Sequence, residues 1–381
     1  MSFWKNLPQP IIGLAPMDGV TDAAFRLITV RHGRPDVSFT EFTPVERIVR
    51  GHDPELTDFR YSEVERPIVA QVFGSDPESF YKTAHVVCAL GFDGIDINMG
   101  CPAKAIAGKG SGAGLIRTPD LARRILRRTK EGVRDWASGQ DLGKAGLPPI
   151  VRETVRRRLT EWGLSSEQAN PHLRKTIPVS VKTRLGYDTV VVEDWVQTLL
   201  SESPAVISIH GRTLKQQYRG EADWELIARA AEIIRKTDTL ILGNGDIRSA
   251  ETSVRRLQET RVHGLLLGRA AMGNPWIFTA REGIRKAAGN GTPPPQEPFI
   301  SIEKRMEAAL EHAVIFDRLK GLRPYRSVRK FLASYCRGFP HASRIRKELV
   351  HAETLSDVET AIQSFLTRKY DEKPLAGTPL P

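Results

Sequence analysis

Cysteine is scarce in this chain: its 381 residues include three, Cys88, Cys101 and Cys336. So few and so widely spaced, they provide neither a disulfide framework nor a Cys-x-x-Cys metal site. Long apolar runs are also missing, since no stretch approaches the ~18 apolar residues of a membrane span, and the amino-terminal residues lack the apolar run of a signal peptide. We therefore expect a cytoplasmic protein, with no membrane segment and no metal, that functions as a monomer.

Acidic residues are fewer than basic ones, 45 against 56, which gives a formal net charge of +11 and a pI near 9.6. An excess of this size favours a polyanionic partner, because Lys and Arg that contact phosphates release condensed counterions. A well-solvated basic surface is the alternative reading. Charge alone does not decide between the two.

Short runs rich in β-branched residues recur eight times, at 11–17, 37–42, 67–74, 94–100, 178–184, 206–212, 239–247 and 262–270. Most of them are continuous apolar runs, which is typical of strands buried on both faces. Helix-like segments separate them, at 77–90, 121–133, 188–200, 223–236 and 249–260. Eight strands alternating with helices predict an α/β fold with a parallel sheet.

Polar or special residues stand at the carboxyl end of nearly every predicted strand: Thr40 and Glu41, Gln71, Asn98, Lys182 and Arg184, His210, Asn244 and Asp246, and Gly268 and Arg269. An open sheet would gather such residues at one switch point, whereas a (β/α)8 barrel draws on several strands at its carboxyl-terminal face. The pattern therefore predicts a closed (β/α)8 TIM barrel.

Composition divides the chain into a barrel at 1–290, a small all-helical domain at 298–371 and a tail at 372–381. The linker sequence Gly-Asn-Gly-Thr-Pro-Pro-Pro at 289–295 marks the boundary, and helices are expected at 301–320, 325–336, 344–351 and 356–370. An insertion at about 135–175, with a helix at 150–163, lengthens one helix-to-strand connection. Such connections lie at the amino-terminal face, so we expect a peripheral decoration, with an RNA-contacting arm as the alternative.

Cys101 follows the fourth predicted strand, in the stretch Asn98-Met99-Gly100-Cys101-Pro102-Ala103-Lys104, and a glycine-rich loop follows at 108–114. A thiol with a reference pKa of ~8.5 is mostly protonated at neutral pH. It suits a proton donor as well as a nucleophile activated by a base. Cys88, inside an apolar helix, is instead expected to be structural.

A phosphate-bearing ligand is indicated after strands seven and eight, by Gly243-Asn244-Gly245-Asp246 and by Gly268-Arg269-Ala270-Ala271-Met272-Gly273. Those loops form the usual phosphate cradle of this fold, and Arg269 can bind an anion with its planar guanidinium. Tight turns with a surface arginine are the alternative. Lys182 and His210 add a cation and an imidazole on neighbouring strand ends.

Taken together, these stretches resemble the dihydrouridine synthase family of flavin enzymes that modify tRNA. The similar segments lie at 14–22, 70–74, 96–104, 181–184, 209–213, 243–247 and 268–275, and the Asn-Met-Gly-Cys-Pro run with its glycine-rich loop is the most specific. The resemblance covers residues 11 to 287 and continues more weakly into the helical domain. The insertion departs from the family's usual pattern.

The resemblance implies reduction of tRNA uridines to dihydrouridine, with FMN on the barrel mouth and NADPH (or NADH) as reductant. Cys101 would protonate C5 of uracil after hydride transfer to C6. The cofactor would be bound by Pro16, Met17, Asp18, Gln71, Lys182, His210, Asn244, Gly245, Asp246, Gly268 and Arg269. Contacts to the RNA substrate are expected from Asn98, Arg184 and Tyr218 and, in the basic helical domain, from Arg323 and Arg326.

Two other functions fit part of the pattern. One is an FMN barrel enzyme acting on a free pyrimidine, similar to dihydroorotate dehydrogenase, but the basic helical domain and the Gly-Cys-Pro-Ala-Lys loop count against it. The other is a non-catalytic RNA-binding barrel, which predicts a colourless protein rather than a yellow flavoprotein absorbing near ~450 nm.

Overall fold

A computed structural model describes residues 2–51, 56–164, 174–319 and 324–371. The chain forms two compact units, one of residues Met1–Ala271 and Trp276–Glu297, the other of Met272–Pro275 and Pro298–Pro381. The predicted tail at 372–381 and Arg323 lie outside the described residues.

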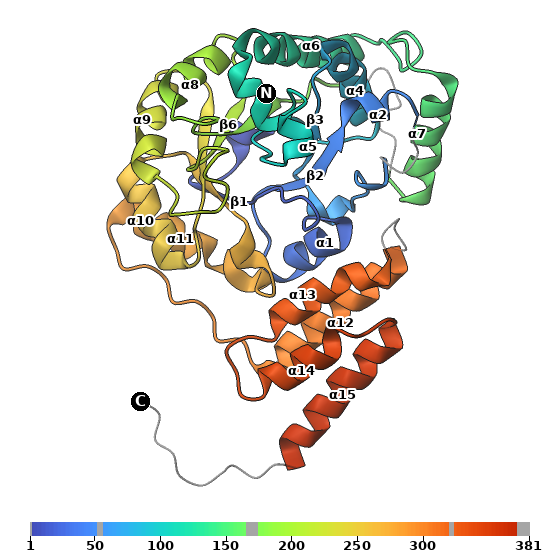
Figure 1. Ribbon diagram of the computed structural model, residues 1–381, viewed down its shortest axis with the longest axis vertical. Helices are drawn as coiled ribbons and strands as arrows, with labels where there is room; N and C mark the ends of the chain where they lie inside the picture. Colours follow the sequence, from blue (N-terminus) through green and yellow to red (C-terminus); the bar gives the residue numbers. More distant parts are fainter. Residues whose placement is uncertain (1, 52–55, 165–173, 320–323, 372–381) are drawn as a thin grey trace. The chain divides into compact units, whose positions relative to one another are not determined.

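Eight parallel strands form the centre of the first unit (Figure 1). They are β1 (Ile11–Leu14), β2 (Ser38–Pro44), β3 (Ile68–Phe73), β4 (Gly94–Met99), β5 (Val179–Arg184), β6 (Val206–His210), β7 (Leu240–Asn244) and β8 (Gly264–Leu267). The sheet order is β1-β8-β7-β6-β5-β4-β3-β2. Two backbone hydrogen bonds close the gap between β1 and β2, from Leu14 N–H to Val37 O and from Asp36 N–H to Ile12 O, both 3.0 Å. The predicted TIM-barrel fold is thereby confirmed.

Helices surround the strands, as the alternating pattern predicts (Figure 1). They are α1 (Ala23–His32), α2 (Val45–Ile48), α4 (Pro77–Ala89), α5 (Lys104–Ala107), α6 (Pro119–Ala137), α7 (Pro149–Glu161), α8 (Val192–Leu200), α9 (Trp224–Ile234), α10 (Ala250–Thr260) and α11 (Arg281–Asn290). Several begin at a side-chain cap that satisfies a free backbone N–H. Asp22, for example, accepts from Phe25 N–H, and Asp223 accepts from Leu226 N–H.

The helix of the insertion, α7, packs against a neighbouring connection of the barrel. Helix α7 contacts the connection that leaves the carboxyl end of β2: Arg158 Nη2 lies 3.4 Å from Thr57 Oγ1, and a Cβ on Gly51 would stand 2.5 Å from an Ile150 methyl. Thirteen residues of helix span about 20 Å at ~1.5 Å per residue, enough to follow the flank of the barrel. Helix α7 therefore packs against the connection between β2 and β3, a contact that the sequence does not predict.

The second unit is all-helical, as predicted. It contains α12 (Ile302–Leu319), a short 3-10 turn η8 (Tyr325–Val328), α13 (Arg329–Tyr335), α14 (Ala342–Leu349) and α15 (Leu355–Asp371). Its core includes His312, whose ring stacks on Phe331 at a centroid distance of 5.0 Å. Burial lowers the pKa of His312 to about 3, so this histidine is a neutral core residue.

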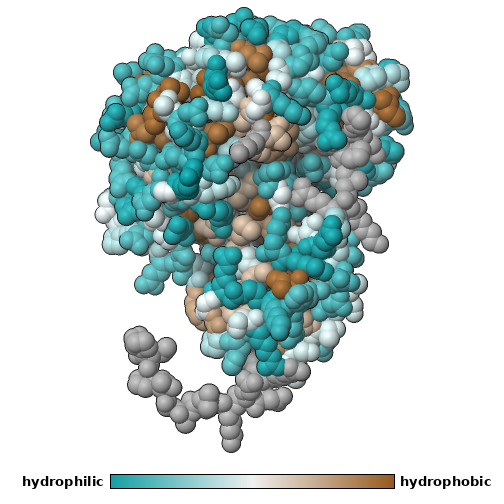
Figure 2. All heavy atoms as spheres, viewed as in Figure 1, coloured by the Kyte–Doolittle hydropathy of each residue, from teal (hydrophilic) through white to brown (hydrophobic). Residues whose placement is uncertain are grey.

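No helix among the described residues is both long and apolar enough to span a bilayer. On the face drawn in Figure 2, hydrophobic residues lie in scattered groups among hydrophilic ones. Within the described ranges, no three His, Cys, Asp or Glu side chains gather as metal ligands would.

The amino-terminal end of the barrel is filled by Trp4, from the 3-10 turn η1 (Phe3–Asn6). Its indole is 1% exposed and belongs to one apolar cluster with interior strand residues such as Ile11, Val206 and Leu240. Hydrophobic packing therefore holds this end of the barrel together, and polar chemistry is left to the other end.

We predict that Trp4→Ala lowers the free energy of unfolding by about 3–5 kcal/mol, because a large cavity is left in the core. Lys5→Ala on the same turn removes only an exposed ion pair to Asp238 and should cost less than about 1 kcal/mol. Urea unfolding of both variants measures the difference. Similar small losses in the two would mean that the indole does not support the barrel.

Candidate active site

The strand register brings the predicted polar residues together at the carboxyl end of the barrel. Asn98 of β4 is the register partner of Lys182 on β5, and His210 of β6 is the partner of Asn244 on β7. Arg184 pairs with His210. Because parallel strands end at one edge, these side chains form one continuous row around the mouth.

Cys101 lies in the loop after β4 and is 7% exposed. Its backbone N–H donates to Asn98 Oδ1 at 2.8 Å, and the N–H of Gly100 donates to the same oxygen at 3.0 Å. Burial, together with the nearby Asp18 carboxylate, raises the pKa of the Cys101 thiol even though Arg184 and Lys182 oppose the shift. The thiol is therefore protonated at neutral pH.

Lys182 is a partly buried cation in the middle of this row. Burial lowers its pKa to about 8, with a further contribution from Arg184, while Asp96 acts in the opposite direction. At neutral pH most of the Lys182 amines are still charged. The mouth thus holds a positive charge that is poorly solvated and available to an anionic group.

His210 is an uncharged imidazole surrounded by cations. Burial lowers its pKa well below the usual value, and Lys182, Arg184, Arg212 and Arg269 lower it further. Its Nε2 lies 3.4 Å from Arg212 Nη1. A neutral His210 can both donate and accept a hydrogen bond at neutral pH.

The predicted phosphate cradle is organised by the Asp246 carboxylate. It accepts from Arg212 Nη2 at 2.6 Å, from Arg269 Nη2 at 2.9 Å and from Ala222 N–H at 2.9 Å. Burial opposes ionisation, but the bonds from Arg212 and Ala222 outweigh it and keep the pKa of Asp246 below its usual value. Asp246 therefore aligns two guanidinium groups, one buried and one with 58% of its side chain exposed.

At two glycines of the cradle, a side chain would crowd neighbouring groups of the mouth. A Cβ on Gly245 (φ +130°) would stand 2.6 Å from the Ala222 methyl and 3.1 Å from the His210 ring. One on Gly268 would stand 3.1 Å from Met17 Sδ. Glycine at 245 therefore lets Ala222 and His210 approach the backbone closely, and glycine at 268 lets Met17 do so.

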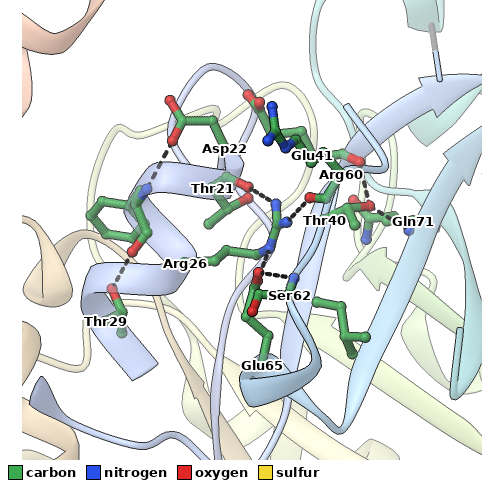
Figure 3. Close-up of polar contacts among 12 residues, drawn as sticks. Thr21, Asp22, Arg26, Thr29, Thr40, Glu41, Arg60, Ser62, Glu65 and Gln71 are labelled. Atoms are coloured by element: carbon green, nitrogen blue, oxygen red, sulfur yellow. Dashed lines mark hydrogen bonds and ion pairs between the residues drawn. The ribbon is translucent and has the colours of Figure 1, made fainter. Parts of the chain in front are cut away.

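The loop after β1, with Pro16, Met17 and Asp18, is linked through Thr21 to Arg26, a buried arginine on α1. Figure 3 shows the contacts of Arg26 with Thr21 and Glu65. Arg26 Nε binds Glu65 at 2.7 Å and its Nη1 donates to Thr21 O at 2.7 Å. Thr21 Oγ1 in turn accepts from Met17 N–H at 3.0 Å. Arg26 and Glu65 are at most 1% exposed, so this pair fixes the loop rather than binding a ligand.

The remaining predicted residues differ in how they are placed. Gln71 is fully buried and its amide bonds to Asp96 and Asn98. Arg184 donates to Gly100 O at 2.6 Å and to Thr213 O at 3.2 Å, so part of its guanidinium braces two loops of the mouth. Tyr218 is 65% exposed, with the Arg269 guanidinium 5.4 Å from its ring centre. Arg326 is exposed on η8 of the helical unit.

Two residues of the site were missed from the sequence, Arg212 and Asp96. The sequence analysis gave no role to Arg212, which belongs to the Ile-His-Gly-Arg-Thr stretch at 209–213. Its position just beyond the end of a strand indicates a place at the mouth of the barrel. Asp96 interrupts the apolar run Gly94-Ile95-Asp96-Ile97, and a charge at an inward position of a buried strand was the clue.

Comparison with known proteins agrees with this geometry. The family model described as Dihydrouridine synthase (Dus) matches residues 13–136 and 169–370, and the stretch between the two matches contains α7. A protein of Bacillus subtilis (strain 168), "Probable tRNA-dihydrouridine synthase 2", is 33% identical over 377 residues, 97% of this chain and 98% of that one.

"Probable tRNA-dihydrouridine synthase" of Staphylococcus aureus (strain COL) is 32% identical over 374 residues, 96% of this chain and 95% of that one. The same-named protein of Staphylococcus epidermidis (strain ATCC 35984 and its synonyms) is 31% identical over 378 residues, 96% of this chain and 97% of that one. The chain belongs to the dihydrouridine synthase family.

Proposed function

We propose that this protein reduces uridines of tRNA to 5,6-dihydrouridine, with FMN as cofactor and NADPH or NADH as reductant. The observation that carries the proposal is the protonated thiol of Cys101, held at the barrel mouth in the same row as Lys182, His210 and the Arg269 cradle. Family membership and the tRNA-dihydrouridine synthase names of the relatives support it.

The residues present fit FMN. Its phosphate would be held by Arg269, by the neutral His210 and by backbone groups at Gly245 and Gly268. The Asp246 carboxylate would keep Arg269 and Arg212 in place rather than touch the phosphate, since two anions repel. Met17 and Pro16, partly exposed on the braced β1 loop, would lie along the flat ring.

When bound, FMN supplies the hydride that uracil receives at C6. The chain's own part is to hold a proton on Cys101 Sγ for C5 and a positive charge on Lys182 beside the flavin ring. The raised pKa of Cys101 keeps that proton in place at neutral pH. A uridine stacked in folded RNA must be extruded before it can enter the mouth.

Extrusion requires binding energy from the rest of the RNA, which phosphate contacts can provide. The net charge of +11 suits this. At the mouth, exposed Tyr218 and the Arg269 guanidinium above it offer a stacking surface and a cation to a nucleotide. Arg326 in the helical unit is proposed as a phosphate contact.

We predict that Cys101→Ala abolishes uridine reduction, with a loss of about 10²–10⁴ in rate, yet leaves reduction of the bound flavin by NADPH unchanged. Stopped-flow absorbance follows the flavin, and nucleoside analysis of treated tRNA counts dihydrouridine. Cys88→Ala is the matched control, since Cys88 is buried in α4 and its loss should leave both steps intact. Normal dihydrouridine yield from Cys101→Ala would refute the acid role.

Arg269→Ala is predicted to weaken FMN binding by about tenfold or more, because a charge-assisted bond to the phosphate is lost. Quenching of flavin fluorescence on titration measures the affinity. Arg229→Ala removes an exposed arginine paired with Glu225 on α9 and serves as the control. Riboflavin, which lacks the phosphate, should bind wild type and Arg269→Ala alike; an equal loss for both flavins would place Arg269 away from the phosphate.

For Arg326→Ala we predict weaker tRNA binding and a slope of log K against log salt that is reduced by about one. FMN affinity should stay as in wild type. Binding measured at several salt concentrations checks this, and an unchanged slope would remove Arg326 from the phosphate contacts.

A further inference from the structure

Asp96 is a carboxylate in the interior of the barrel that the reaction scheme above does not use. It lies in the middle of β4 and is 0% exposed. One oxygen accepts from Ser180 Oγ at 2.6 Å and the other from Gln71 Nε2 at 2.7 Å. Burial raises its pKa to about 6, against the opposing effects of these bonds and of Lys182. It is therefore mostly ionised at neutral pH and can only accept hydrogen bonds.

An acceptor at this position determines how two amides are oriented. Gln71 must direct its NH₂ group to Asp96, so its Oε1 is left to accept from Asn98 Nδ2 at 3.1 Å. Asn98 must then direct its Oδ1 away from Gln71, and this oxygen accepts the backbone N–H groups of Gly100 and Cys101. The carboxylate at the start of the series and the two backbone N–H groups at its end require the same order, so both ends keep the two amides in one orientation.

We propose that Asp96 is a positioning residue for Cys101, which it anchors through the amides of Gln71 and Asn98. The inference rests on the proposed function for the role of the thiol as proton donor. Reversal of the Asn98 amide would place its NH₂ against two backbone N–H groups, and the loop that carries the thiol would lose its anchor.

The same orientation determines what Asn98 can offer to a substrate. Both lone pairs of its Oδ1 are used by backbone N–H groups, and one N–H of its Nδ2 is not needed by Gln71. The group left over is a donor, which fits a ligand carbonyl. Uracil has a carbonyl at C4 where cytosine has an amino group, so a donor from Asn98 that meets C4 would suit uridine.

A matched pair of variants isolates the carboxylate. Asp96→Asn alone can keep the order, because Ser180 Oγ can accept from the new NH₂ group. Ser180→Ala removes this acceptor, but the Asp96 carboxylate still accepts from Gln71. The hydrogen bonds from Gln71 through Asn98 to the Cys101 loop should therefore be kept. Ser180→Ala with Asp96→Asn differs from it by one oxygen exchanged for NH₂. That NH₂ group must face either the Gln71 NH₂ or the place that Ser180 Oγ has left, so the series is no longer satisfied at this end.

The measurement is the alkylation rate of each cysteine by iodoacetamide, followed by mass spectrometry on the full-length purified holoenzyme. Ser180→Ala should match wild type within about twofold, and the double variant should raise the Cys101 rate by about fivefold or more, as loss of a local hydrogen bond does. Cys88 and Cys336 are at most 1% exposed and should be unchanged. Repeating the measurement from about pH 7 to about pH 10 distinguishes a change in the fraction of Cys101 present as thiolate from a change in its accessibility to iodoacetamide.

Asn98→Leu breaks the series after Gln71 while keeping the charge of Asp96, and it should raise the Cys101 rate to the same extent. Adding it to the double variant should give no further rise, because residues that act through one another are not additive. An unchanged Cys101 rate, additive effects, or a parallel rise at all three cysteines would overturn the proposal. None of these readouts needs uridine reduction, so a failure of the proposed function is seen separately.

Discussion

The polar half of the barrel interior depends on one constraint: a buried polar group must be hydrogen-bonded to a neighbour. On the side of β1, β2, β7 and β8 the interior includes Phe39, Leu242 and Leu266, which lie in one apolar cluster with Trp4. On the other side it holds Gln71, Asp96 and Ser180, which bond to one another. Polar chemistry at the mouth is possible because this half of the interior is satisfied from within.

That division gives the mouth two different electrostatic regions. Above the polar half, Asp96 partly balances the charge of Lys182, whose pKa nevertheless falls to about 8. At the ends of β6, β7 and β8, Arg212 and Arg269 share one carboxylate, that of Asp246. Two guanidiniums on one carboxylate leave an unbalanced positive charge. An anion is therefore favoured there, and burial together with the same excess of positive charge keeps His210 neutral.

Much of the fold could be predicted because its signals are local. The eight apolar runs and the polar residues behind them mark the strands and the face of the barrel on which the site lies. Strand ends were less certain: the run at 262–270 becomes the shorter β8, Gly264–Leu267, because Gly268 and Arg269 turn away to form the cradle. The course of α7 could not be predicted either, since nothing in its own sequence states which loop it packs against.

Interactions between distant residues account for the rest of what was missed. Arg212 and Asp246 are 34 positions apart, and Asp96 and Ser180 are 84 apart. Sequence spacing does not show that such residues meet; only the register of the strands does. The polar residues predicted at the strand ends lie together at the mouth, while the carboxylates that orient them had either no role assigned or, for Asp246, a direct one.

The chemistry of Cys101 is decided by the same balance between burial and charge. The sequence left two roles open, a proton donor or a nucleophile with a lowered pKa. Lys182 and Arg184 favour the thiolate, but burial and the Asp18 carboxylate outweigh them. A thiolate would be the better nucleophile, whereas a thiol is the form that can give a proton to carbon. Because the cations at the mouth do not ionise it, the protonation state of this cysteine agrees with the proposed proton donor and not with the nucleophile.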